Sequence, residues 1–280
     1  MKRTLGVHQA LYLKPLLYGL SGSDAPFDIH QDLPAQLAVK FRERIPPYEA
    51  GFAFLSPLDY ARHGSEYRII PGVAVSSNAR SGTIQLYIKY QVHNIHTLAV
   101  DVRCTSEIIL AKIILLEKYT NLTPERTAIQ YLPMLPDCTA MLEKADAALV
   151  VNFAPEPASA KDHFSIDLVD EWFDLTELPY LHGFWVGREE DVSAAEIQAL
   201  LRARDQGFLH HSALAVEEAS RLSIPEEIVE EYFESFSYEF GEEQEASLSE
   251  YSRYAFYHGI IPDVPDINFF NLEPPTEALN

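Results

Sequence analysis

The sequence predicts an α/β protein with two lobes, because strand and helix signals alternate in two successive blocks. Up to residue 90 the predicted order is β-α-β-α-β-α-β-β, and a second alternating block follows from about residue 97. Such alternation is typical of sheets with helices packed on their faces. The chain of 280 residues is long enough for two domains of ordinary size. We therefore expect sheets flanked by helices, with a ligand cleft between the lobes.

The first block consists of short apolar runs between turn residues. Its predicted strands are residues 4–13, 27–30, 51–55, 69–76 and 83–90. Helices are expected over residues 15–20, after Asp32 as an N-cap, and after Ser56-Pro57.

The second block repeats this plan and leads into a helical C-terminal part. Its predicted strands are residues 97–102, 129–132 and 147–152, and its helices begin at Thr105-Ser106 and Cys138. Residues 180–186 are a further apolar strand that can cross back to the first block, and Ser193 to Glu196 fit a capping box. We expect residues 1–92 with 187–280 in one lobe and 93–186 in the other.

Charge and hydropathy restrict the kinds of partner. The formal net charge of −21 predicts repulsion from phosphate backbones and anionic lipids. No apolar run approaches membrane-spanning length, and polar residues interrupt the N-terminal stretch where a secretory signal would be apolar. We expect a cytoplasmic protein without nucleic-acid or membrane partners. The glutamates between residues 217 and 250 indicate a solvated helix face or a docking patch for a basic partner.

Metal and nucleophile signatures are weak. Cys104 and Cys138 are not spaced as a metal knuckle and are interpreted as buried thiols. The pairs His93/His96 and His210-His211 lack neighbouring ligands at metal spacing, and we expect no metal. The sequence has neither a glycine-rich phosphate loop nor a Gly-x-Ser-x-Gly elbow.

An ordered set of segments resembles the chorismate dehydratases of the futalosine route to menaquinone. One is Tyr67-Arg68-Ile69-Ile70-Pro71-Gly72, and another runs from Asp167-Leu168 through Trp172 to Leu175-Thr176-Glu177-Leu178-Pro179-Tyr180. The remaining segments are residues 5–7, 13–20, 53–61, 105–106, 184–185 and 232–257.

This resemblance implies a two-lobed type II periplasmic-binding-protein-like fold with mixed sheets. It also implies a lyase that dehydrates chorismate to 3-[(1-carboxyvinyl)oxy]benzoate without metal or redox cofactor. Such an enzyme holds two carboxylates, and one of the substrate's own carboxylates can serve as the base. Positioning and preorganised electrostatics then supply most of the rate.

Seven side chains are expected to bind this small carboxylate substrate, because they lie at strand ends or helix starts or near them. They are Tyr12, Ser56, Thr83, Arg103, Thr105, Ser106 and Asn152. The alternative for Ser56, Thr105 and Ser106 is helix capping without a ligand. The alternative for Arg103 is an ordinary surface arginine.

The sequence differs from the family pattern in the expected pocket. Tyr12 replaces an asparagine, Thr83 falls near a family serine, and Val151-Asn152-Phe153 lacks the acidic residue of Ile-Gly-Asp. Two other functions therefore stay open. One is a non-catalytic carboxylate-binding protein, and the other is a dihydroxynaphthoate-synthase-like enzyme of the same pathway, for which His8 and His182 are the candidate bases.

Overall fold

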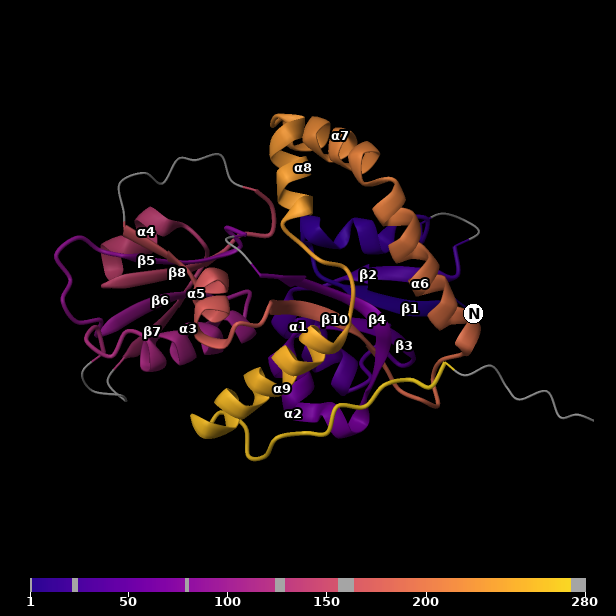
Figure 1. Cartoon of the computed structure of the whole chain (residues 1–280), viewed down its shortest axis with the longest axis horizontal. Helices are drawn as coiled ribbons and strands as arrows, with labels where there is room; N and C mark the ends of the chain where they lie inside the picture. Colours follow the sequence, from indigo (N-terminus) through magenta and orange to yellow (C-terminus); the bar gives the residue numbers. More distant parts are fainter. Residues whose placement is uncertain (1, 22–24, 79–80, 124–128, 156–163, 273–280) are drawn as a thin grey trace, which may run out of the picture.

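The described chain forms two sheets with helices on their faces (Figure 1). The computed structural model describes residues 2–21, 25–78, 81–123, 129–155 and 164–272. Figure 1 shows the two sheets side by side, with most of the helices around the larger lobe. None of the helices in these ranges combines the length and apolar content needed to cross a membrane.

The first sheet has the strand order β2-β1-β3-β10-β4. Its strands are β1 (Arg3–Val7), β2 (Phe27–Gln31), β3 (Gly51–Leu55), β4 (Arg68–Ser77) and β10 (Tyr180–Gly187). β1 pairs in parallel with β2 and β3, whereas β10 runs antiparallel to both of its neighbours. The expected mixed sheet is therefore present, and the predicted return of residues 180–186 is confirmed.

The second sheet has the order β7-β6-β8-β5-β9. Its strands are β5 (Ile84–Ile88), β6 (Thr97–Asp101), β7 (Gln130–Met134), β8 (Ala147–Val151) and β9 (Phe164–Asp167). β6 pairs in parallel with β7 and β8, and β5 lies antiparallel between β8 and β9. Each sheet thus places one antiparallel strand beside a parallel set.

The sheet pairing does not follow the expected lobe boundaries at 92/93 and 186/187. β5 comes from the segment assigned to the first lobe but pairs in the second sheet, and β10 comes from the second but pairs in the first. Backbone pairing, which sequence order does not reveal, produces this exchange of strands. We propose that the chain passes between lobes after β4 and again between α5 (Leu168–Thr176) and β10.

Helices cover both sheets. The first sheet packs against α6 (Ala194–Leu209), α7 (His211–Leu222) and α8 (Glu226–Glu234) on one face, and against α1 (Pro34–Arg42), α2 (Pro57–His63) and α9 (Glu242–Tyr257) on the other. The second sheet packs against α3 (Ser106–Glu117), α4 (Cys138–Lys144) and α5. Because α9 contacts β10 and α3, it joins the lobes.

Several local predictions are confirmed and others are wrong. Ser193 and Glu196 form the predicted capping box. The first strand is shorter than expected, because Leu11–Leu13 and Pro15–Leu17 are 3₁₀ turns, so residues 15–20 form no full helix. Asp32 does not cap α1, since its carboxylate accepts hydrogen bonds from Lys40 and Tyr48.

Gly207 fixes the distance between α6 and the 3₁₀ turn Pro15–Leu17. A Cβ atom at Gly207 would lie 1.9 Å from the carbonyl oxygen of Pro15. Gly207→Ala is therefore expected to destabilise the protein by about 1–3 kcal/mol, although alanine in an open helix stabilises by about 0.5–1 kcal/mol. Urea unfolding measures the change. Gln206→Ala at the exposed neighbouring position is the control, and a Gly207→Ala variant as stable as the control would contradict the close packing.

Candidate active site

The carboxyl ends of parallel strands from both sheets face the region between the lobes. His8 directly follows β1, Ser56 follows β3, and Asn152 follows β8. The helix α3 begins at Ser106, shortly after β6 ends. Ligands of open α/β sheets lie beyond such strand ends, and two adjoining cavities are present there.

The inner cavity is small and lined by polar side chains. Its volume of about 10 Å³ leaves room for about one water molecule. The residues around it come from both lobes: His8, Pro34, Ala35, Phe54, Ser56, Asp59, Thr105, Ser106, Glu107 and His182. Three of the seven predicted binding residues, Ser56, Thr105 and Ser106, therefore meet at one cavity.

Ser56 and Asp59 bond to each other at the start of α2. The Ser56 hydroxyl donates to Asp59 Oδ2 at 2.6 Å and accepts from the Asp59 backbone N–H at 3.2 Å. Burial raises the pKa of Asp59, and the Ser56 hydrogen bond opposes that rise. Ser56 is thus the N-cap residue of α2 in this structure.

The start of α3 is tied to α9. The Ser106 hydroxyl lies 3.1 Å from the Tyr251 hydroxyl, which also donates to the Ser106 carbonyl oxygen at 3.1 Å. Thr105 is the N-cap residue of α3 but makes no side-chain capping hydrogen bond. Of the two hydroxyls, that of Thr105 is the better placed to serve a ligand.

Two neutral histidines form the floor of the inner cavity. His8 Nε2 is hydrogen-bonded to the Tyr12 hydroxyl and His182 Nε2 to the Ser77 hydroxyl, each at 2.8 Å. Burial lowers the pKa of His8 to about 4. Burial, together with the nearby His8, lowers the pKa of His182 to about 3. Both imidazoles are therefore uncharged near neutral pH.

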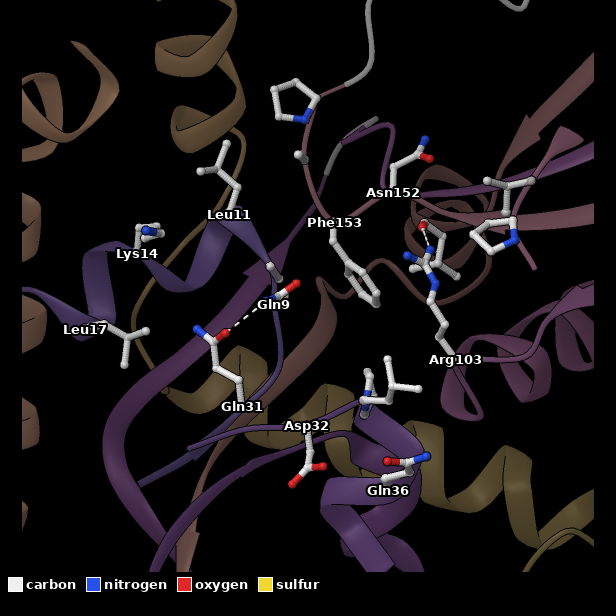
Figure 2. Close-up of a pocket in the computed structure, with 18 of the residues that line it drawn as sticks. Gln9, Leu11, Lys14, Leu17, Gln31, Asp32, Gln36, Arg103, Asn152 and Phe153 are labelled. Carbon is white, nitrogen blue, oxygen red and sulfur yellow. Dashed lines mark hydrogen bonds between the residues drawn. The ribbon is translucent and has the colours of Figure 1, made fainter. Parts of the chain in front are cut away.

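The outer cavity is large enough for a small organic ligand. Its volume is about 970 Å³, at the upper end of the range for ligand pockets. Figure 2 shows Gln9, Lys14 and Gln31 from the first lobe facing Arg103 and Asn152 from the second. Pro34 lines both cavities, so the two adjoin.

Arg103 is held in the outer cavity by a buried carboxylate. Its Nε and Nη2 atoms donate to Asp101, with Nη2 2.6 Å from Oδ2, and Nη2 also donates to the Val151 carbonyl oxygen at 2.8 Å. Asp101 has no exposed surface. The guanidinium also lies over the Phe153 ring, 4.8 Å from its centre. These described bonds leave Nη1 for a ligand carboxylate.

Lys14 and Arg221 share one buried glutamate on the opposite side of the outer cavity. Lys14 Nζ and Arg221 Nε each lie 2.6 Å from a different Glu218 oxygen. Burial alone would raise the pKa of Glu218, but the two cations hold it below its usual value. Two positive charges against one negative charge favour an anion at this wall.

Phe153 connects the lobes between the two cavities. Its carbonyl oxygen accepts from the Leu11 backbone N–H at 2.6 Å. Its ring centre lies 5.5 Å from that of His8. Phe153 lines the outer cavity and His8 the inner one, so this ring contact lies where the two cavities approach each other.

The seven predicted binding residues fall into three groups: three line the inner cavity, two line the outer cavity, and two line neither. Arg103 and Asn152 line the outer cavity, and Asn152 Nδ2 donates to the Gly82 carbonyl oxygen at 2.9 Å. Tyr12 and Thr83 line neither described cavity. Tyr12 packs behind His8 and His182, and the Thr83 carbonyl oxygen accepts from the Asn152 N–H at 2.7 Å.

The prediction of binding residues missed Asp59, Glu107 and Lys14. Glu107 follows Thr105-Ser106 directly, so its position in the first helical turn was the available signal. Lys14 carried no signal, because its place beside the cleft depends on the 3₁₀ turns. Among the described residues, no group of three or more His, Cys, Asp or Glu side chains is arranged to hold a metal ion.

Comparisons with known proteins agree with this architecture. Residues 4–257 match the model of a family described as menaquinone biosynthesis. A chorismate dehydratase from Thermus thermophilus is 24% identical over 217 residues, which cover 73% of this chain and 79% of that protein.

Solved structures show the same fold at low sequence identity. Protein AF1704 from Archaeoglobus fulgidus superposes with a TM-score of 0.72 at 19% identity, covering 93% of this chain and 98% of that chain. The periplasmic aliphatic sulphonate binding protein SsuA from Escherichia coli gives 0.61 at 13% identity, covering 95% of each chain. The predicted periplasmic-binding-protein-like fold is confirmed.

Proposed function

This chain belongs to the menaquinone biosynthesis family, and from that premise we propose that it dehydrates chorismate to 3-[(1-carboxyvinyl)oxy]benzoate. The observation that carries the proposal is the outer cavity, where Arg103 of one lobe faces Lys14 of the other. A substrate with two carboxylates can bind Arg103 on one side of this cavity and Lys14 with Arg221 on the other. The similarity to a chorismate dehydratase supports the same substrate.

The proposed binding mode uses both cavities. One carboxylate binds Arg103 Nη1, with Asn152 beside it, and the other lies at the Lys14–Arg221 wall. The ring hydroxyl points toward Thr105 and the inner cavity, whose volume of about 10 Å³ suits the departing water. Ser56 and Ser106 then shape this end, while Tyr12 and Thr83 support His8 and Asn152 from behind.

The chemistry requires orientation more than a strong protein base. A carboxylate of the substrate removes the ring proton, the neighbouring C–O bond breaks, and the ring becomes aromatic. The protein holds the C–H and C–O bonds in the reactive geometry and stabilises the departing oxygen. The net charge of −21 supports the further proposal that the protein has no nucleic-acid or membrane partners. We also propose a cytoplasmic location, which the similarity to a chorismate dehydratase supports.

Purified protein incubated with chorismate alone tests the proposal. We expect the chorismate absorbance to disappear and an aromatic enolpyruvyl ether to form without added cofactor. A folded protein that is stabilised by chorismate against heat but forms no product would instead indicate a binding protein. If chorismate neither stabilises the protein against heat nor is converted to product, chorismate is not the ligand.

A dihydroxynaphthoate-synthase-like activity is the second candidate, because His8 and His182 both line the inner cavity. Burial lowers the pKa of both imidazoles far below 7, to about 4 and about 3. Histidines with such values are weak bases, which favours chorismate dehydration.

Arg103→Lys is expected to raise KM for chorismate about tenfold, because lysine keeps the charge beside Asp101 but loses the planar fork. Steady-state kinetics measure the change. Arg253→Lys removes a guanidinium whose side chain is 71% exposed, on α9, and is the matched control. An Arg103→Lys variant with the control's KM would contradict the carboxylate contact.

A further inference from the structure

Glu107 places a carboxyl group in the inner cavity that the proposed binding mode does not use. It lies in the first turn of α3 and lines the cavity beside Ser56, Thr105 and His182. The backbone N–H groups of Glu107 itself and of Thr105 act to lower the pKa of this carboxyl. None of the salt bridges among the described residues pairs Glu107 with a cation.

The groups around Glu107 disfavour its negative charge. Burial is the largest effect, and the carboxylates of Asp59 on α2 and Asp101 at the end of β6 add to it. Glu107 also interacts with Tyr12, Arg103, Cys104, Tyr180 and Tyr251, of which the Arg103 guanidinium favours the charged carboxylate. Burial and the carboxylates of Asp59 and Asp101 outweigh this effect and raise the pKa of Glu107 to about 7. A substrate with two negative charges would favour the protonated form further.

The other ionisable groups at the inner cavity are poor proton donors near neutral pH. His8 and His182 are neutral there, since burial lowers their pKa values to about 4 and about 3. The Asp59 carboxylate already accepts a hydrogen bond from the Ser56 hydroxyl, which in turn accepts one from the Asp59 backbone N–H. Glu107 lines the cavity, and its pKa of about 7 lets it both hold and release a proton near neutral pH.

We propose that Glu107 is the general acid of the dehydration and donates its proton to the departing ring hydroxyl. This inference rests on the proposed function. The substrate carboxylate takes the ring proton, and the C–H electron pair becomes the new ring double bond. The C–O electron pair leaves on oxygen, which receives the Glu107 proton and departs as water. The proton on the substrate carboxylate then returns to Glu107 through solvent, so one water is lost overall.

Glu107→Gln tests this role, because glutamine keeps the size and neutrality of the protonated acid but donates no proton. We expect kcat for chorismate to fall about 100-fold or more, with KM within about threefold. In the wild-type protein kcat should decline as pH rises above about 7, since the acid form is active. That decline should be absent in Glu107→Gln. Glu243→Gln removes an exposed glutamate of α9 and should match the wild type.

The outcomes separate the inference from the function on which it rests. Wild-type protein without chorismate turnover would refute the proposed function. Wild-type turnover with an unchanged kcat in Glu107→Gln would overturn the role of Glu107 alone. If Glu107→Gln fails to fold, Glu107→Asp replaces it, with an expected kcat loss of about tenfold and a retained alkaline decline. Unchanged kcat and pH profile in that variant would also overturn the role.

Discussion

Trp172→Ala is expected to destabilise the protein by about 3–5 kcal/mol, the usual range for removing a large buried aromatic side chain. Trp172 lies on α5 and has no exposed surface. Its ring contacts Tyr180 of β10 and Tyr251 and Tyr254 of α9, with centres 5.9–6.3 Å apart. Because β10 belongs to the first sheet and α5 covers the second, the substitution opens a cavity between the lobes.

Urea unfolding of Trp172→Ala and Phe173→Ala provides the comparison. Phe173 is the next residue of the same helix and is 37% exposed, so its truncation should cost about 1 kcal/mol or less. The Trp172 variant should also lose chorismate turnover, because the junction holds the Ser106–Tyr251 contact at the inner cavity. Equal free energies of unfolding for the two variants would contradict a central role for Trp172.

The buried histidines are expected to make the protein sensitive to mild acid. The folded state keeps His8 neutral down to about pH 4, whereas an unfolded imidazole binds a proton near its ordinary pKa of 6.5. The unfolded state therefore takes up protons first, and stability falls as pH decreases from 6.5 toward 4. At about 1.4 kcal/mol per unit, His8 alone accounts for a loss of about 3 kcal/mol. His182 extends the loss to about pH 3.

The free energy of unfolding measured between pH 4 and 7 tests this linkage. His8→Gln should reduce the dependence on pH, because glutamine does not titrate and keeps a polar group for the Tyr12 hydroxyl. His93→Gln removes an exposed imidazole and should follow the wild-type curve. A His8→Gln curve parallel to the wild type would show that His8 does not contribute to the acid sensitivity.

Local sequence signals predicted the elements well where their cause is local. The apolar run Gly51–Leu55 and the Ser193 capping box follow from residue order and backbone preference. The N-cap at Ser56 followed in the same way. Asp32 failed as a predicted cap because Lys40 and Tyr48, distant in sequence, compete for its carboxylate.

The candidate site was predictable only in part. Ser56, Thr105 and Ser106 were found because strand ends and helix starts in α/β proteins meet at one edge. Glu107 was missed because a glutamate in a first helical turn usually faces solvent and interacts with the helix dipole. Here the turn packs against α2 and α9, and burial replaces solvation.

The sequence by itself determined the α/β class, the approximate strands and helices, and the family, because these depend on hydropathy period, capping and residue order. The tertiary structure alone decided which sheet receives β5 and β10, and therefore where the lobes exchange strands. It also decided that two cationic walls face one cavity and that Asp101 holds Arg103. Such pairings are set by contacts between residues far apart in the chain, whose distances and burial no local pattern encodes.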